Sequence, residues 1–301
     1  MQIGIDLGGS HIAVGIVSER NNIVSKKEMD IFKVQPESEM KEYLIDNIKI
    51  LINQVLREVG APSCVLSKIA IAIPGKVKNN IAYDIYNLGI TEFDICKILE
   101  EHYGVEVKVR NDAKCAALAE KEKGSLIGYD DCVFLCIGTG IGGATFINGR
   151  MIEYSKEWGS EYGHMIIEKD GIECNCGNKG CWERYASMRA FKDGIIKLLK
   201  LPEDIDSESI VRLLKDKINV NDPVIDQYIS EYLDNVIVGI SNIVNIIQPE
   251  AISIGGGFVY YDEILFDRLR IKINNKHFNG KTPRIMLAKL QNDAGMIGSL
   301  I

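Results

Sequence analysis

The chain has 301 residues, enough for two domains that each bury a core of their own. Its formal net charge is −7, and its 46% hydrophobic and 26% charged residues are typical of a globular protein without low-complexity segments. An acidic balance with no long run of Lys or Arg argues against a nucleic-acid partner. We therefore expect two lobes with a cleft, and a ligand other than nucleic acid.

The N-terminus, "MQIGIDLGGSHIAVGIV", lacks the basic flank and cleavage site of a signal peptide, and no apolar stretch is long enough to span a bilayer. We expect a cytoplasmic protein with no membrane partner. Its eight cysteines are then free thiols or metal ligands rather than a disulfide framework. Five of them stand singly among apolar neighbours and are predicted to be small buried side chains: Cys64, Cys96, Cys115, Cys132 and Cys136.

The first half of the chain alternates between strand and helix patterns. Residues 2–24 predict three strands joined by a glycine turn and a polar turn, and residues 132–152 repeat that plan. Between these copies we predict helices at 38–60, 91–103 and 113–124, and strands at 68–75 and 105–112. This alternation is typical of a largely parallel α/β sheet.

The second half is more helical. We predict helices at 187–200, 207–217, 222–249 and 259–276, and strands at 250–257 and 284–290. The apolar tail is too short for a domain and is expected to pack back as a helix, on the first lobe. The predicted lobes are a smaller one of residues 1–112 plus 292–301 and a larger one of residues 113–291, which contains the segment 161–183.

Three glycine-rich turns follow buried strands: "DLGGS" at 6–10, "GTGIGG" at 138–143 and "GGG" at 255–257. Glycine allows backbone N–H groups to approach phosphate oxygens, although a single such turn is more commonly an ordinary hairpin. None ends in the Gly-Lys-Ser/Thr of a P-loop, and the first two lack the following helix of a dinucleotide fold. The pattern therefore favours phosphate binding outside the P-loop and dehydrogenase classes.

Two acidic residues, Asp6 and Asp112, lie at the ends of predicted strands, where each has a possible role in phosphate chemistry. Asp6 can hold Mg²⁺ through water beside a phosphate, or it can simply bond its own turn. Asp112 follows Asn111 between a strand and a helix, where a carboxylate either caps the helix or deprotonates a hydroxyl in a crevice at the sheet's carboxyl edge.

The spacing His164-x9-Cys174-x-Cys176-x4-Cys181 provides three thiolates and an imidazole, the ligand set of a closed tetrahedral zinc site. Four protein ligands leave no position for a reacting water. The predicted ion is therefore structural and shapes its loop.

The segments "EYGH" and "CNCGNKGCWE" are similar to the ExGH and CxCGxxGCxE motifs of the ROK family of repressors, open reading frames and sugar kinases. "DLGGS", "IPGKV", "VRNDA", "GTGIGG" and "IGGG" resemble the other landmarks of that family in the same order, so the resemblance covers the whole chain. It implies a two-lobed actin- and hexokinase-like (ribonuclease H-like) α/β fold with a structural zinc loop, and a homodimer.

The resemblance also implies an ATP-dependent hexose kinase that uses Mg²⁺ and takes glucose at its 6-hydroxyl by default. Asp112 resembles the general base of the family. The implied sugar ligands are Gly75, Asn111, Asp112, Glu161, His164 and Glu183. The implied nucleotide ligands are Asp6, Gly8, Gly9, Ser10, Gly138, Thr139, Gly140, Gly142, Gly255, Gly256 and Gly257. His164 is expected to bind zinc through one ring nitrogen and the sugar through the other.

The chain departs from the family pattern at Lys114 and Ile90, which bear on sugar preference. Lys76 beside Gly75 either reaches a sugar substituent or is a solvated turn lysine. N-acetylmannosamine kinase and fructokinase are the alternative activities. A sugar-responsive transcriptional regulator is disfavoured, because the first strand begins at residue 2 and we expect no preceding DNA-binding domain.

Overall fold

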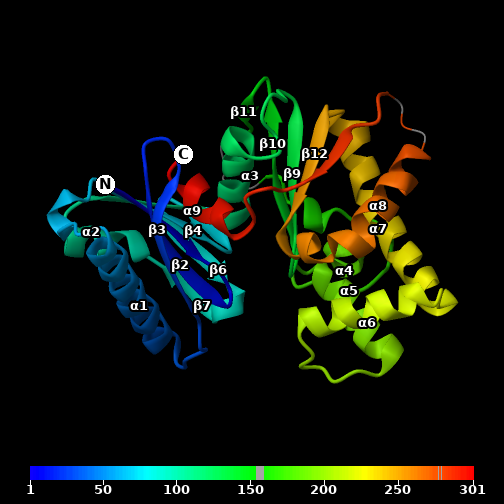
Figure 1. The fold of residues 1–301 in the computed structure, drawn as a ribbon, viewed down its shortest axis with the longest axis horizontal. Helices are drawn as coiled ribbons and strands as arrows, with labels where there is room; N and C mark the ends of the chain where they lie inside the picture. The colour runs from blue at the N-terminus through cyan, green and yellow to red at the C-terminus, as the bar shows by residue number, and fades with distance from the viewer. Residues whose placement is uncertain (154–158, 277, 279) are drawn as a thin grey trace. The chain divides into compact units, whose positions relative to one another are not determined.

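The computed structural model describes residues 1–153, 159–276, 278 and 280–301 (Figure 1). The chain divides into two compact units, the first with Met1–Gly124 and Asn292–Ile301, the second starting at Ser125 and ending at Gln291. The sequence placed the boundary after Asp112, whereas helix α3 (Asp112–Lys123) belongs to the first unit. It does so because α3 packs along the C-terminal helix α9 (Ala294–Ser299).

The five-stranded sheet of the first unit has the order β3-β2-β1-β4-β8. Its strands are β1 Gln2–Leu7, β2 His11–Val17, β3 Ile23–Asp30, β4 Lys68–Ile73 and β8 Glu106–Asn111. Helix α1 (Glu37–Glu58) buries an apolar stripe that includes Leu44, Ile48 and Ile52 in the core of this unit. That stripe has the helical spacing from which the helix was predicted.

A second, three-stranded sheet in the first unit was not predicted. It consists of β5 Lys76–Lys78, β6 Ile81–Ile85 and β7 Ile90–Phe93. The helix expected at 91–103 begins only at Ile95, where α2 (Ile95–Tyr103) is capped by Asp94, whose carboxylate accepts the N–H of Lys97 at 3.2 Å. The residues before it pair as a strand because Ile90 and Phe93 are buried in the core of this unit.

The sheet of the second unit has the order β11-β10-β9-β12-β13. Its strands are β9 Cys132–Ile137, β10 Ile141–Ile147, β11 Arg150–Met151, β12 Ala251–Gly255 and β13 Arg284–Leu287. Its helices are α4 Glu183–Ala186, α5 Met188–Leu199, α6 Ser207–Asn219, α7 Pro223–Ile247 and α8 Asp262–Asn274. Within the described ranges, every helix of the chain is too short or too polar to cross a bilayer.

The two large sheets share one topology, which confirms the internal duplication read from residues 2–24 and 132–152. In each sheet the first three strands of a copy form an antiparallel meander, and two further strands add in parallel beside its first strand. The sheets are thus mixed, and the expectation of a largely parallel sheet was wrong for the meander strands. Hairpin turns of a few residues can join only antiparallel neighbours.

Among the cysteines that were predicted to be buried, Cys96, Cys115 and Cys132 are buried, whereas Cys136 is half-buried and Cys64 is exposed. Cys64 lies in a short 3-10 helix, Ser63–Val65, which buries none of its side chains. Its apolar neighbours in sequence therefore misled the prediction.

Helix α7 packs directly on Trp182, the largest fully buried side chain among the described residues. A Cβ added to Gly239 would lie 2.0 Å from Cε2 of the indole, and the indole N–H donates to the carbonyl of Asn235 at 2.8 Å. The α7 backbone thus forms one wall of the tryptophan site, which immediately follows Cys181.

Substitution of Gly239 tests this packing. Alanine normally stabilises a helix interior by about 1 kcal/mol relative to glycine, but overpacking of a buried site costs about 1–3 kcal/mol. We expect Gly239→Ala to lower the melting temperature, and Val238→Ala, its half-exposed neighbour, to change it little. A Gly239→Ala protein that melts higher than wild type would contradict the close contact.

Candidate functional site

The junction between β8 and α3 holds the predicted base. Asn111 caps α3: its side-chain oxygen accepts the N–H of Lys114 at 3.2 Å, and its amide donates to the carbonyl of Gly75 at 3.0 Å. Asp112 is the first helical residue, and its carboxylate accepts the N–H of Ala113 at 2.7 Å. The alternative in which Asp112 is the ordinary N-cap is therefore wrong, because Asn111 takes that role.

Gly75 belongs to a turn that no other residue fits. Its φ is +90°, and a Cβ would lie 2.5 Å from the carbonyl oxygen of Tyr83. Beside it, Lys76 forms an ion pair with Asp84 at 2.7 Å. This pair supports the interpretation of Lys76 as a turn lysine. The turn itself is tied to the base through the bond from Asn111 to Gly75.

The two predicted acidic site residues of the first unit, Asp6 and Asp112, both have pKa values above that of an ordinary aspartate. Desolvation by the surrounding protein raises the pKa of Asp112 to about 6. The hydrogen bond from the N–H of Ala113 acts in the opposite direction and lowers it. Desolvation also raises the pKa of Asp6 to about 7, with a further increase from the negative charge of Asp112 and a decrease from Lys26. Two neighbouring carboxylates of this kind favour a divalent cation or a transferable proton close to them.

The first glycine turn closes through a hydrogen bond from the N–H of Gly8 to the carbonyl of His11 at 2.9 Å. A Cβ on Gly9 would lie 3.1 Å from the side-chain amide nitrogen of Asn87. This turn, at Gly8, Gly9 and Ser10, directly follows Asp6 at the end of β1. The structure thus packs the predicted phosphate turn of the first unit on the segment that contains Asn87.

Gly295 was not predicted as a site residue. It lies near the C-terminus and packs against the carboxylate of Asp6. A Cβ at Gly295 would lie 2.4 Å from Oδ2 of Asp6, and one at Gly298 would lie 1.7 Å from the carbonyl oxygen of Cys115. Helix α9 therefore contacts both β1 and α3 through its glycines, as part of the first unit. The sequence signal for this contact was the pair of glycines, three residues apart, in the apolar tail. The tail packs on the first unit, as expected.

In the second unit, the two remaining glycine turns lie side by side. A Cβ on Gly138 would be 4.0 Å from the backbone nitrogen of Gly257, and Gly138 accepts the N–H of Met188 at 2.9 Å. Gly256 has a φ of +73°, and Thr139 is exposed at the tip of the hairpin that continues through Gly140 and Gly142. The ends of β9 and β12 thus bring two glycine turns together, an arrangement that is compatible with phosphate binding by backbone N–H groups.

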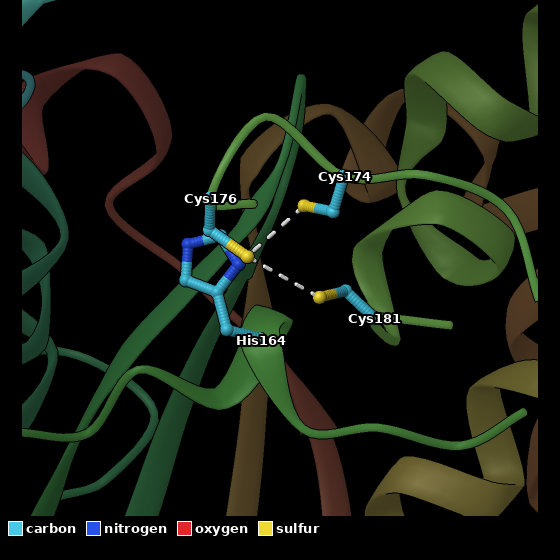
Figure 2. Close-up of side chains that lie close together, drawn as sticks. All are labelled: His164, Cys174, Cys176 and Cys181. Atoms are coloured by element: carbon cyan, nitrogen blue, oxygen red, sulfur yellow. Dashed lines mark hydrogen bonds between the residues drawn. The ribbon is translucent and has the colours of Figure 1, made fainter. Parts of the chain in front are cut away.

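The four predicted metal ligands converge (Figure 2). Their ligand atoms all lie within 4.8 Å of one another, with Sγ of Cys176 at 3.5 Å from Sγ of Cys181, and Sγ of Cys174 at 3.7 Å from Nδ1 of His164. Ligands of a tetrahedral zinc ion with Zn–S bonds near 2.3 Å are about 3.8 Å apart. The donor set and its spacing are compatible with a structural zinc ion, held by three thiolates and Nδ1 of His164.

The chain wraps around this cluster through glycines and a buried tyrosine. Gly177 and Gly180 have φ values of +91° and +77°, and short bridges join Ile166 to Cys181 and Glu173 to Lys179. The 3-10 helix Tyr162–His164 is anchored by the buried Tyr162, whose hydroxyl bonds to Thr145. Glu161, just before this helix, is exposed, and the second ring nitrogen of His164 points away from the thiols (Figure 2).

Glu183 connects the cluster of predicted metal ligands to the hairpin that is predicted to bind phosphate. Its Oε1 lies 3.8 Å from Nδ1 of His164, and its Oε2 accepts the N–H of Ile141 at 3.4 Å. A Cβ on Gly140 would lie 2.6 Å from the same Oε2. The structure thus places Glu183, a predicted sugar ligand, against the 138–143 turn as well as beside His164.

The two departures from the family pattern have different surroundings. Ile90 is only 2% exposed and belongs to the core of the first unit, so its side chain is a packing residue. Lys114 lies in the first turn of α3, half-buried, two residues after Asp112.

Comparison with known proteins gives a family for the whole chain. The model of the ROK family matches residues 2–301. A glucokinase of Thermotoga maritima is 31% identical over 99% of this chain and 95% of its own length. A ROK hexokinase from Thermus thermophilus superposes with a TM-score of 0.77 at 28% identity, over 99% of this chain and 95% of that one. A xylose repressor of Bacillus subtilis is 26% identical over 98% of this chain and 75% of its own length.

The family match, the glucokinase similarity and the cluster of one histidine and three cysteines lead to the same assignment. The chain belongs to the ROK family.

Proposed function

We propose that this protein is an ATP-dependent sugar kinase that transfers the γ-phosphate of ATP to a hydroxyl of a hexose, with Asp112 as general base. The observation that carries the proposal is the separation of roles at the β8–α3 junction: Asn111 caps the helix, and Asp112 keeps an ionisable carboxylate. A pKa of about 6 makes that carboxylate a base at neutral pH that is stronger than an ordinary aspartate. The similarity to a glucokinase and a hexokinase supports the same reaction class.

The proposed reaction relies on positioning and charge rather than on covalent catalysis. Asp112 accepts the proton of the attacking sugar hydroxyl, and Asn111 and Gly75 hydrogen-bond the same sugar. Glu161, His164 and Glu183, from the second unit, accept hydrogen bonds from the ring hydroxyls. Their placement depends on the zinc loop.

The three glycine turns are assigned to the nucleotide, with Asp6 to Ser10 and Gly138 to Gly142 at the phosphates and Gly255 to Gly257 at the adenosine. The raised pKa of Asp6, caused by burial and by the charge of Asp112, is typical of a carboxylate that a cation compensates. We assign Mg²⁺ to this carboxylate through water. The ion would neutralise charge that develops on the transferring phosphate.

Glucose, at its 6-hydroxyl, is the first substrate we propose, and N-acetylmannosamine and fructose are the alternatives. An ADP-release assay over hexoses and amino sugars tests both the activity and the choice. Glucose should give the highest kcat/KM. A protein that released no ADP with any sugar of the panel would contradict the proposed function.

Substitution of the base tests its role. Asp112→Asn removes the proton acceptor while it keeps the shape of the side chain, so we expect kcat to fall by about 10²- to 10⁴-fold with sugar affinity nearly unchanged. Asp46→Asn, at an exposed position of α1, is the control and should keep wild-type kcat. Sugar binding by calorimetry and turnover by ADP release separate the two effects. Near wild-type kcat in Asp112→Asn would show that another group accepts the proton.

The pKa of Asp112 predicts the pH profile. Because the pKa is raised, the protonated and inactive form accumulates below about pH 6. We expect kcat/KM to be level above that pH and to fall by about tenfold per pH unit below it. An acid limb centred near pH 4 would mean that Asp112 titrates as an ordinary aspartate and would contradict the desolvated site.

Loss of the metal tests the organising role of the cluster. Cys176→Ser removes one of four ligands, so we expect the protein to lose zinc and sugar affinity to fall by about 10- to 100-fold. Cys64→Ser, an exposed thiol of the first unit, is the matched control and should retain both. Zinc content by mass spectrometry and sugar binding by calorimetry are the measurements. Wild-type sugar affinity in a zinc-free Cys176→Ser protein would refute the role.

A further inference from the structure

A basic pocket lies along the free edge of the second unit's sheet, where β13 is the last strand. Its cavity has a volume of about 460 Å³, within the usual range for small-molecule sites. The lining combines apolar side chains, including Phe266 and Met286, with three cationic ones, Arg270, Arg284 and Lys289. None of the lining residues belongs to the glycine turns or to the zinc cluster.

The charge of this region stands out in both sequence and structure. Residues 268–290 contain seven Lys or Arg and no Asp or Glu, in a chain with 35 basic and 42 acidic residues. On α8, Arg268 and Lys272 are neutralised by Asp226 and Asp234 of α7, at 2.8 and 2.6 Å. Arg270, by contrast, lines the pocket, so it is the cationic residue that α8 contributes to this site.

The two arginines of the pocket have weaker polar partners than Arg268 and Lys272 have. Arg270 is 56% exposed, lies 3.8 Å from the carboxylate of Asp267, and has its guanidinium 5.8 Å from the centre of the Phe266 ring. Arg284 donates to the phenol oxygen of Tyr129 at 3.1 Å, a neutral partner. Guanidinium groups held in this way retain N–H donors for an anion, and their planar geometry matches phosphate oxygens.

The strand itself adds backbone donors. The N–H groups of Arg284 and Ala288 bond to Glu250 and Ile254, on the side of β12. Because peptide groups alternate in direction along a parallel strand, those of Ile285 and Leu287 point away from β12, toward the open edge. The pocket thus combines charged donors and edge-strand N–H groups with apolar side chains.

We propose that this pocket binds a small phosphorylated metabolite, with the phosphate held by Arg270 and Arg284. A concave site of this size, lined by both cationic and apolar side chains, fits a compact ligand. A nucleic acid or a membrane surface requires a broad basic face, which the net charge of −7 disfavours. The shared chemistry of the ligand is a phosphate group, and its source is either a sugar phosphate or a linear polyphosphate.

Binding measurements test the site independently of turnover. Glucose 6-phosphate and tripolyphosphate are titrated separately into wild type, into Arg270→Gln/Arg284→Gln, and into the control Arg20→Gln/Arg212→Gln, which removes two exposed arginines elsewhere. We expect the pocket variant to lose at least about tenfold in affinity for the preferred probe, because each arginine supplies charge-assisted hydrogen bonds. The control should bind as wild type does. The tighter probe identifies the source of the phosphate.

Three results would overturn the proposal: equal affinity in wild type and the pocket variant, equal losses in both double variants, or no binding of either probe by wild type at about 5 mM. Matching melting temperatures of the variants verify that they are folded. Glucose 6-phosphate is also the product of the proposed kinase, and tripolyphosphate resembles the triphosphate of ATP. Both double variants keep every residue assigned to sugar and nucleotide, so a loss of affinity confined to the pocket variant reports on the pocket and not on the proposed kinase site.

Discussion

The arrangement of the candidate base depends on two hydrogen bonds of one side chain, Asn111. One caps α3 and the other holds the Gly75 turn, so the strand end, the helix start and the turn are fixed together. Because Asn111 is the N-cap, Asp112 does not have to cap the helix. Asp112 lies in a desolvated position, which raises its pKa. A carboxylate that also served as the cap would be held ionised by the helix N-terminus and would be a weaker base.

In the second unit, Glu183 has a comparable linking position. It lies beside His164 of the metal cluster and accepts a backbone N–H of the 138–143 hairpin. Zinc in the cluster would stiffen both ends of the segment 161–183, where Glu161 and Glu183 lie. Through Glu183 it would also stabilise the position of the hairpin, without taking part in the chemistry. The candidate metal site and the proposed phosphate turn therefore share one structural support, Glu183.

Much of the fold was predictable because its signals are local. The 3.6-residue stripe of α1, the glycine turns after buried strands and the repeated meander can all be read in short windows. The cysteine spacing also predicted the cluster, since the ligands are close in sequence and zinc chemistry restricts the donor set. The sheet of β5, β6 and β7 was missed because Ile90 and Phe93 are consistent with either a strand or a helix until their burial is known.

Contacts between distant segments could not be predicted from the sequence. Gly295 reaches Asp6 across almost the full length of the chain, and its tail looked only apolar. The basic pocket likewise depends on α8 and β13, where neutralisation of Arg268 and Lys272 by α7 decides which face keeps its charge. Pairings of this kind are set by tertiary packing, which local propensity does not encode.

The proposed reaction of this ROK family protein is the transfer of phosphate to a sugar hydroxyl. Phosphorus-31 NMR of the protein with ATP, Mg²⁺ and glucose tests it most directly, because the technique identifies the product as well as the turnover. A hexose phosphate ester that grows in equal amount with ADP is the expected result. Accumulation of inorganic phosphate without an ester, or unchanged ATP with every sugar tried, would contradict it.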